Sequence, residues 1–475
     1  MADIIRPDLC VIGAGALGID LALLARQRGL DVALVDAPGT DQVDPVRGSL
    51  RRAAFLASAA RAQAIRNAGH VGLDAAPPKP NFRVISEHAA ARAASAAPRD
   101  TVERLTALGI ALPEGAAHFA DQRTLSCGET TIRARQFALA TGASPVIPPL
   151  AGLDEVSYFT PDTIGDNIRK LSHLVVIGGT PQALELAQAY RRLGSMVTVV
   201  PQGGLLPGFE PELVAILLQA LREEGVVIRD DAQVAAILPR SQGTGVTLDT
   251  ASGDDSLDVS HILVAMGSAP LLDAGLLDKL KLRRDRLRAD HLLVGPNGQT
   301  SNGRVSAIGG AAGEHRPHIA ARQAGLLVER LSGLGNGRLD PLLVPRIVAT
   351  EPALAEVGVF AGGKPPRPGQ SVLRASLAET DAARAVGEMP GAVRLVAGRD
   401  GAIASAGAVG LGAGETIAIL ALAMASGLRL GDLGRLALSQ PSPAAALLDL
   451  ANQHLAQQPR RSRSRRLAGL GRILP

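Results

Sequence analysis

Thiols and aromatic side chains are scarce in this sequence. The 475 residues include two cysteines, Cys10 and Cys127, no tryptophan, and only 2% aromatic residues. Two cysteines exclude a disulfide framework, which suits a reducing compartment. So few aromatic rings argue against recognition of nucleic acids or glycans by stacking. We expect Cys10 to be a small buried residue within a strand and Cys127 to lie in a turn between strands.

Long apolar runs and a strong net charge are also missing. The most apolar stretch, residues 402–428, contains Glu415 and several glycines, so it is not a transmembrane helix. A strand close to the N-terminus leaves no room for a signal peptide, and we expect a cytoplasmic protein. The net charge is only +4, and lysines are few among the 49 basic residues. This bias toward arginine is more typical of a GC-rich genome than of a nucleic-acid-binding surface.

Positive charge is concentrated at the C-terminus. Residues 459–475 form a basic tail with six arginines, namely Arg460, Arg461, Arg463, Arg465, Arg466 and Arg472. Together with the leucines of this tail, they are compatible with contact to an anionic membrane surface. Because such compositions are more commonly disordered, we expect a disordered tail and keep membrane contact as the alternative.

A dinucleotide-binding pattern begins near the N-terminus. Apolar residues 9–12 precede a glycine-rich turn and a helical stretch, and apolar residues 32–35 end at Asp36, 18 residues beyond the turn. The turn consists of Gly13, Ala14, Gly15, Ala16, Leu17 and Gly18. In such turns the first glycine allows the bend, the second lets the backbone approach a pyrophosphate, and the third lets the helix pack on the strand. The helix N-terminus attracts phosphates, and Asp36 is placed to bind ribose hydroxyls. The pattern therefore predicts a site for the ADP half of a dinucleotide.

A second unit of the same kind follows. It comprises an apolar strand at 174–177, a helix at 182–193 and a strand at 196–200. Short apolar strands that end in glycine turns recur at residues 137–142, 262–267 and 305–310. From residue 341 the sequence is rich in β-type stretches, and helices are expected at 415–426 and 444–457. Two nucleotide-binding lobes followed by a third region are therefore predicted.

The order of these elements resembles the pyridine nucleotide–disulfide oxidoreductases, such as dihydrolipoamide dehydrogenase and mercuric reductase, over nearly the whole chain. The resemblance rests on residues 13–18 with Asp36, 140–142, 307–309, 344–352 and 413–415. It implies an α/β fold with two Rossmann-like nucleotide-binding domains and a C-terminal α+β dimerisation domain. The FAD domain would comprise residues 1–145 and 266–340, the NAD(P)-like domain 146–265, the dimerisation domain 341–458, and the basic tail 459–475.

The same resemblance implies a cofactor and its binding residues. FAD would contact Gly13, Ala14, Gly15, Ala16, Leu17, Gly18, Asp36, Ala140, Thr141, Gly142, Gly309 and Gly310. The protein would be a homodimer that binds no nucleic acid. No metal ligands and no catalytic residues are assigned.

The family's thiol chemistry does not carry over to this sequence. The family places a pair of cysteines and then a lysine on the helix beside the flavin, whereas residues 11–126 contain no cysteine. The matching positions are Asp44, Ser49 and, for the lysine, Ala53. The family's His–Glu pair, which serves the thiols, corresponds to Gln440 and Ala445. Without a thiolate there is no thiol–disulfide exchange by this route.

The nucleotide sites deviate from the family as well. In the second turn Thr180 and Ala183 replace glycines, Pro181 removes a backbone donor, and no acidic residue follows the strand that ends at residue 200. Binding of NAD(P) is therefore doubtful. Gly310 replaces an aspartate that helps to hold FAD, a loss of about 1–3 kcal/mol that weakens binding without abolishing it.

A few charged residues near the expected flavin have uncertain roles. Glu185 stands where the family keeps a glutamate, but the lysine that pairs with it is missing. Arg51 and Arg52 either face the flavin or belong to the solvated face of a helix at 50–66, and we favour the solvated face. His454 is expected at the surface.

Three functions remain open. The first is an FAD-dependent oxidoreductase without dithiol chemistry, which passes electrons between flavin and an unidentified small substrate or protein carrier. The second is a catalytically degenerate FAD-binding pseudoenzyme that acts as a scaffold or interaction partner. The third is an NAD(P)H oxidase or quinone reductase.

Overall fold

The chain divides into two compact units by its contacts. The computed structural model describes residues 3–36, 45–95, 101–358, 366–387 and 390–458. Unit 1 comprises Met1–Leu205 and Val226–Asp340, and unit 2 comprises Leu206–Gly225 and Pro341–Pro475. This grouping counts contacts and does not test the domain boundaries predicted from the sequence, which stay a prediction. The basic tail lies outside the described residues.

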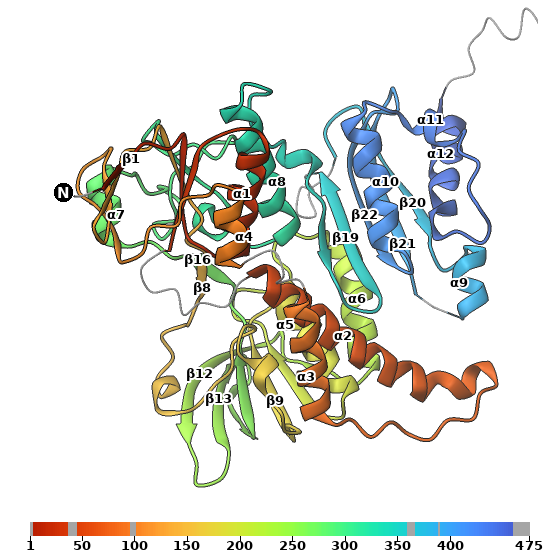
Figure 1. The fold of residues 1–475 in the computed structure, drawn as a ribbon. Coiled ribbons are helices and arrows are strands. Elements are labelled where there is room, and N and C mark those ends of the chain that lie inside the picture. Colours follow the sequence, from red (N-terminus) through yellow and green to blue (C-terminus); the bar gives the residue numbers. More distant parts are fainter. Residues whose placement is uncertain (1–2, 37–44, 96–100, 359–365, 388–389, 459–475) are drawn as a thin grey trace, which may run out of the picture. The chain divides into compact units, whose positions relative to one another are not determined.

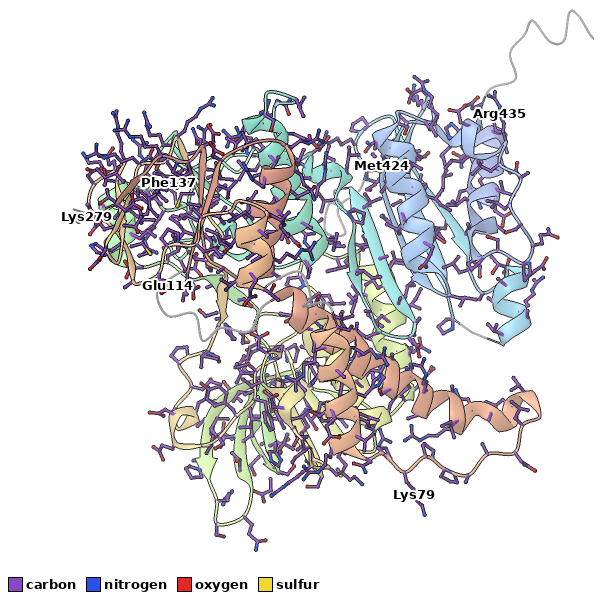
Figure 2. All side chains as sticks on the ribbon, in the orientation of Figure 1. Lys79, Glu114, Phe137, Lys279, Met424 and Arg435 are labelled. Atoms are coloured by element: carbon purple, nitrogen blue, oxygen red, sulfur yellow. The ribbon has the colours of Figure 1, made fainter. Side chains whose placement is uncertain are left out.

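The first sheet of unit 1 is parallel, with the strand order β17-β7-β2-β3. Its strands are β17 (Val305–Ala307), β7 (Gln136–Leu139), β2 (Leu9–Ile12) and β3 (Val32–Val35). Helices α1 (Ala16–Gln27) and α8 (Pro317–Leu331) supply the core on one face. A small sheet covers the other face, with the order β1 (Asp3–Ile5), β6 (Thr130–Ile132), β5 (Leu125–Cys127) and β4 (Ala117–Phe119). Phe137 of β7, labelled in Figure 2, is fully buried between these layers, as expected for a parallel sheet covered on both faces.

The second sheet of unit 1 repeats this parallel arrangement. Its strands, in spatial order, are β11 (Val227–Ile228), β10 (Met196–Val200), β9 (His173–Ile177) and β15 (His261–Val264). Helix α5 (Pro181–Arg192) packs on β9 and β10. An antiparallel sheet of β12 (Ala232–Pro239), β13 (Thr244–Thr250) and β14 (Gly253–Val259) shares a core with it. This antiparallel sheet was not predicted from the sequence.

A pair of helices, α2 (Pro45–Asn67) and α3 (Phe82–Ala94), lies side by side in unit 1 (Figure 1). The prediction placed the start of α2 at residue 50, but the helix begins at Pro45, a residue type well suited to a first turn. Helix α2 also packs on α5. The Tyr190 ring of α5 lies 5.2 Å from the ring of Phe55 and 6.1 Å from that of Phe82. These aromatic contacts bind the helix pair to the second sheet.

Unit 2 is an antiparallel sheet with helices. The strand order is β18 (Arg346–Val348), β19 (Ala353–Gly358), β22 (Ile403–Gly410), β21 (Ala392–Gly398) and β20 (Gln370–Ser376). Helices α10 (Ala413–Ala425) and α6 (Pro211–Glu223) contact β19 and β22, and α12 (Ala446–Gln457) contacts β20. This is the α+β arrangement predicted for the C-terminal region. His454 is buried on α12, with Nε2 3.0 Å from Nε2 of Gln458, so its predicted surface position is wrong.

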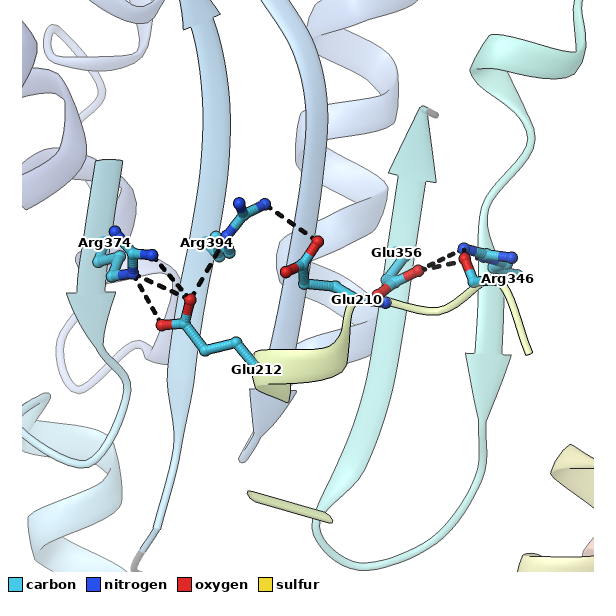
Figure 3. A network of polar contacts seen from close by, with 7 residues as sticks. Glu210, Glu212, Arg346, Glu356, Arg374 and Arg394 are labelled. Carbon is cyan, nitrogen blue, oxygen red and sulfur yellow. Dashed lines mark hydrogen bonds and ion pairs between the residues drawn. The ribbon is translucent and has the colours of Figure 1, made fainter. Parts of the chain in front are cut away.

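A network of buried charges joins the start of α6 to the sheet of unit 2 (Figure 3). The fully buried Glu356 carboxylate accepts hydrogen bonds from the Glu210 backbone N–H at 2.7 Å and from Nη2 of Arg346 at 2.7 Å. Glu210 in turn pairs with Arg394 at 3.1 Å, and both side chains are at most 10% exposed. Glu212 pairs with the more exposed Arg374 at 2.7 Å. The charges explain why residues 206–225 group with unit 2.

Candidate functional site

The first glycine turn shows three different environments for its three glycines. Gly13 has φ +114°, and a Cβ added there would lie 2.4 Å from the Ala140 carbonyl oxygen. A Cβ on Gly18 would lie 1.8 Å from the Gly13 carbonyl oxygen. Around Gly15 no atom of the described residues lies within 4 Å of such a Cβ. Gly13 and Gly18 are therefore required by packing, whereas the space beside Gly15 is open for a ligand.

The N-terminus of α1 begins at a glycine. Its N-cap residue is Gly15, in an extended conformation and without a side-chain hydrogen bond. With the helix dipole, the N–H groups of the first turn of the helix favour an anion at this position. Asp36 follows β3 directly and is exposed. The predicted residues 13–18 and Asp36 thus lie at the carboxyl ends of adjacent parallel strands, where nucleotides bind in such sheets.

A cavity of about 680 Å³ lies at the carboxyl ends of β2 and β7. Its volume is in the range of ligand pockets. It is lined from the strand ends, from β4 and β5, and from helix α7 (Ala274–Leu280). The lining residues are Ile12, Ala116, Ala117, His118, Phe119, Leu125, Leu139, Thr141, Leu271, Leu272, Asp273, Gly275, Leu276 and Lys279. Of the predicted cofactor residues, Thr141 contributes to this wall.

Two further predicted cofactor residues, Gly309 and Gly310, lie against Leu17 and the turn at residues 140–142. A Cβ on Gly310 would lie 2.6 Å from the carbonyl carbon of Gly142, so a side chain at 310 requires the backbone to shift. A Cβ on Gly309 would lie 2.4 Å from Cδ2 of Leu17. The Gly309 N–H donates a hydrogen bond to Oε1 of Gln323 at 2.8 Å. Both glycines are buried in the 3-10 helix η4 (Gly309–Ala312).

The turn of the second nucleotide-binding unit differs from the first. Oγ1 of Thr180 accepts a hydrogen bond from the Ala183 N–H at 3.2 Å and donates one to the Ala265 carbonyl at 2.9 Å. Pro181, the next residue, has no N–H to offer. A Cβ on Gly179 would lie 2.1 Å from the Gly204 carbonyl oxygen, so the chain's own backbone lies over the turn. The N-terminus of α5 thus offers fewer amides to a phosphate than that of α1.

Arg51 and Arg52 form ion pairs with other elements. Arg51 pairs with Asp166 at 2.7 Å and donates to the Gly165 carbonyl at 2.9 Å, both in the 3-10 helix η3 (Ile164–Asp166). Nε of Arg52 lies 3.3 Å from Oε2 of Glu185, and these two side chains are 19% and 7% exposed. The solvated helix face that we favoured is therefore wrong. Glu185 therefore pairs with a cation of α2, Arg52, which lies one residue before the position of the family's lysine, Ala53.

A small cavity of about 30 Å³ lies beside these arginines, with room for about one or two water molecules. Arg51, Arg52, Asp162 and Tyr190 are among its lining residues. Burial raises the pKa of the Asp162 carboxyl, and the Arg52 charge opposes that rise. Burial likewise raises the pKa of Tyr190 to about 12. This pocket therefore brings the Asp162 carboxyl together with two arginines of α2.

Both thiols of the chain are buried in the core of unit 1. Cys10 lies within β2, as predicted, whereas Cys127 is the last residue of strand β5 and not part of a turn. The Cys127 S–H donates to the Gly115 carbonyl at 3.2 Å. Burial raises the pKa of each thiol, so neither is a thiolate at neutral pH.

The described segments contain no group of three or more His, Cys, Asp or Glu residues arranged to hold a metal ion. Within the same segments, no helix is long and apolar enough to cross a membrane.

The family model described as pyridine nucleotide-disulphide oxidoreductase matches residues 7–325. The chain belongs to this family. It is 30% identical to the dihydrolipoyl dehydrogenase of Thermus scotoductus, covering 94% of this chain and 96% of that protein. It is 28% identical to the mercuric reductase of Streptomyces lividans, covering 90% and 92%.

The solved structures support the same fold. LpdA from Mycobacterium tuberculosis superposes with a TM-score of 0.82 at 23% identity, covering 94% of this chain and 99% of that one. The HOCl-induced flavoprotein disulfide reductase RclA from Escherichia coli gives 0.78 at 20% identity, with the same coverage. The predicted fold class and family are therefore confirmed. The family consists of FAD-binding oxidoreductases, and the open turn at residues 13–18 with Asp36 fits the ADP half of that cofactor.

Proposed function

We propose that the chain is an FAD-dependent oxidoreductase that exchanges electrons with a small substrate or a protein carrier without a redox-active dithiol. Gly13–Gly18 and Asp36 would hold the ADP half of FAD, with Ala140–Gly142 and Gly309–Gly310 at its flavin end. Bound flavin supplies the electron-transfer chemistry. The residues of this chain bind and orient the cofactor and set the charge around it.

The observation that carries this proposal is the state of the thiols. Residues 11–126, which include the helix that bears the family's cysteine pair, contain no cysteine. The two cysteines elsewhere are buried in strands with raised pKa values. Arg51 and Arg52 occupy the expected dithiol region and are tied into ion pairs. These features support flavin chemistry without thiol–disulfide exchange.

An anaerobic dithionite titration of the FAD-loaded full chain tests the proposal. A flavin alone takes up about two electrons per FAD, and a working disulfide raises the uptake to about four. We expect about two, both in the natural chain and in a Cys10→Ala/Cys127→Ala variant. An uptake near four in the natural chain that falls in the double variant would contradict the proposal.

We further propose that nicotinamide dinucleotides do not bind the second unit in the family's usual pose. The Thr180 cap, Pro181 and the Gly204 backbone over Gly179 support this. Anaerobic addition of NADH or NADPH should then leave the flavin absorbance unchanged. Rapid bleaching would instead favour the NAD(P)H oxidase or quinone reductase hypothesis.

A pseudoenzyme is the second candidate, and the loss of the family's cysteine pair and of its His–Glu pair, which corresponds to Gln440 and Ala445, favours it. A scaffold does not require nucleotide at the first turn, whereas an oxidoreductase does. Gly15→Val should retain the fold, because no atom of the described residues lies within 4 Å of a Cβ there and the backbone is extended, and it should block the ligand. If this variant restores the phenotype of a deletion strain, the scaffold function is supported. If it does not, the oxidoreductase is supported.

A further inference from the structure

An exposed and strongly basic segment follows helix α7 in unit 1. Residues 279–288 contain six basic side chains and one acidic one, Asp285, whereas the whole chain has a net charge of only +4. The six basic residues are exposed, namely Lys279, Lys281, Arg283, Arg284, Arg286 and Arg288. Lys279, labelled in Figure 2, lies at the outer edge of unit 1. Positive charge is therefore concentrated on one small surface.

Hydrogen bonds shape residues 281–293 into a hairpin, called here the basic hairpin. The Asp285 N–H donates to the His291 carbonyl at 2.9 Å. Nearer the tip, the Leu287 N–H donates to Oδ1 of Asp285 at 2.8 Å, and Nη1 of Arg284 donates to the Ala289 carbonyl at 2.8 Å. These polar groups of the tip are thus paired within the hairpin, which lowers the cost of moving the tip out of bulk water.

An apolar side chain stands at the tip of the basic hairpin. Leu287 is 94% exposed, and the next most exposed large apolar side chains of the described segments, Val71 and Leu422, are 66% exposed. Its two neighbours in the chain are the exposed Arg286 and Arg288. The hairpin therefore presents one apolar side chain to the outside, with a cation on each side of it.

The rest of unit 1 does little to neutralise the cations of this segment. The Arg288 side chain lies 3.8 Å from Asp285, and none of the other five cations forms an ion pair with a described residue. Elsewhere in unit 1 arginines have close partners, as in the Arg229–Asp255 pair at 2.8 Å. The charge that would complement the hairpin must therefore come from another molecule.

We propose that the basic hairpin docks onto the surface of an anionic lipid bilayer, with Leu287 in the interface and the cations among the headgroups. Cations are attracted to anionic headgroups, and an apolar side chain gains by leaving water. A soluble polyanion would contact the cations but leave Leu287 in water. A bilayer satisfies both features, because one surface offers negative charge with an apolar layer beneath it. The hairpin is not part of the nucleotide-binding turns, so docking does not depend on the proposed electron transfer.

Sedimentation of the full chain with lipid vesicles tests the docking. Vesicles of equal parts phosphatidylcholine and phosphatidylglycerol should bind the natural chain, whereas phosphatidylcholine alone should not. Leu287→Ser should lower the partition coefficient about tenfold. Arg286→Gln/Arg288→Gln should lower it about twentyfold, because each cation near the surface contributes about fivefold.

Matched controls come from exposed residues elsewhere in unit 1. Val71→Ser removes an exposed apolar side chain, and Lys79→Gln/Arg83→Gln removes two exposed cations. Each should stay within about threefold of the natural chain. Binding that survives both hairpin variants would place the contact elsewhere, for example in the basic tail, and overturn the proposal. A loss confined to the arginine variant would overturn it too, since a purely electrostatic contact does not use Leu287. So would a natural chain that does not bind anionic vesicles.

The lack of tryptophan in the chain allows a direct measurement of insertion. Leu287→Trp and Val71→Trp each give the protein one tryptophan. With anionic vesicles, the fluorescence of Leu287→Trp should shift to shorter wavelength and be quenched by lipids brominated on their acyl chains. Val71→Trp should show neither change. An unshifted and unquenched Leu287→Trp on vesicle-bound protein would overturn the insertion of the tip.

Discussion

Among single residues, the glycines of the first turn make the clearest contrast. Gly13 has φ +114° and no room for a Cβ, whereas a Cβ on Gly15 would meet no atom of the described residues within 4 Å. We expect Gly13→Ala to lower the free energy of unfolding by about 1–3 kcal/mol, because a side chain is strained at that φ. Urea unfolding followed by circular dichroism measures this loss. Gly15→Ala is the control and should stay within about 0.5 kcal/mol of the natural chain. Equal losses would contradict these separate roles.

Glu356 gives a prediction of pH dependence. Burial raises the pKa of this carboxyl above its ordinary 4.5, although Arg346 and the Glu210 N–H oppose the rise. The folded state therefore holds the proton more tightly than the unfolded state, and stability is lost as pH rises from about 4.5 through the raised pKa. Glu356→Gln cannot lose a proton. Urea midpoints across this range should show the natural chain losing stability relative to Glu356→Gln as pH rises. A constant or growing advantage of the natural chain would contradict this.

Residue chemistry was predictable where it depends on near neighbours in the sequence. The glycine spacing of residues 13–18 is typical of a tight turn between a strand and a helix, and the structure places the turn at the predicted strand end. The Arg52–Glu185 pair was missed, because the family pattern has its cation as a lysine at position 53 and sequence spacing does not show which residue of α2 faces α5. His454 was misplaced for the same reason, since a lone histidine gives no sign of which helix face is buried.

At the scale of elements, α6 is held to the sheet of unit 2 by charge. Glu210 and Arg394 are at most 10% exposed, whereas Arg374 and Glu212 are 56% and 41% exposed. Glu210→Ala leaves Arg394 with its buried partner removed and should cost about 3–5 kcal/mol of stability. Arg374→Ala breaks the exposed pair and should cost about 0–1 kcal/mol. Thermal and urea unfolding of both variants measures the difference, and similar small losses would show that the buried pair does not anchor α6.

Most elements could be predicted because apolar periodicity marks them. The parallel strands β2, β3, β9 and β10 are uninterrupted apolar runs, and the sequence placed them within one or two residues. Strand β14 was missed, since Asp254, Asp255 and Asp258 make it read as a polar loop. The contacts of α6 with the sheet of unit 2 could not be predicted, because an amphipathic helix shows that one face is buried without showing what covers it.

At the scale of the whole molecule, the outer face of helix α10 is a candidate interface for the predicted homodimer. It is apolar on nearly every side, and its inner face, which includes Ile417 and Leu420, packs in the core of unit 2. Its outer face carries Ala418, Leu422 and Ala425, and Leu422 is 66% exposed. A helix without a polar face is normally covered on all sides. In a symmetric dimer the same patch can cover itself, so we propose this face as part of the dimer interface.

Leu422→Glu should therefore weaken the dimer, because each interface would bury two carboxylates without a partner. Light scattering at micromolar concentration should give twice the 48.8 kDa chain mass for the natural protein and a mass close to one chain for the variant. Leu287→Glu is the control, since Leu287 is 94% exposed in unit 1 and should not affect assembly. A natural protein with the mass of one chain would contradict the dimer itself. A dimeric Leu422→Glu variant would instead place the interface away from α10, because a buried carboxylate pair at this position is incompatible with a stable contact.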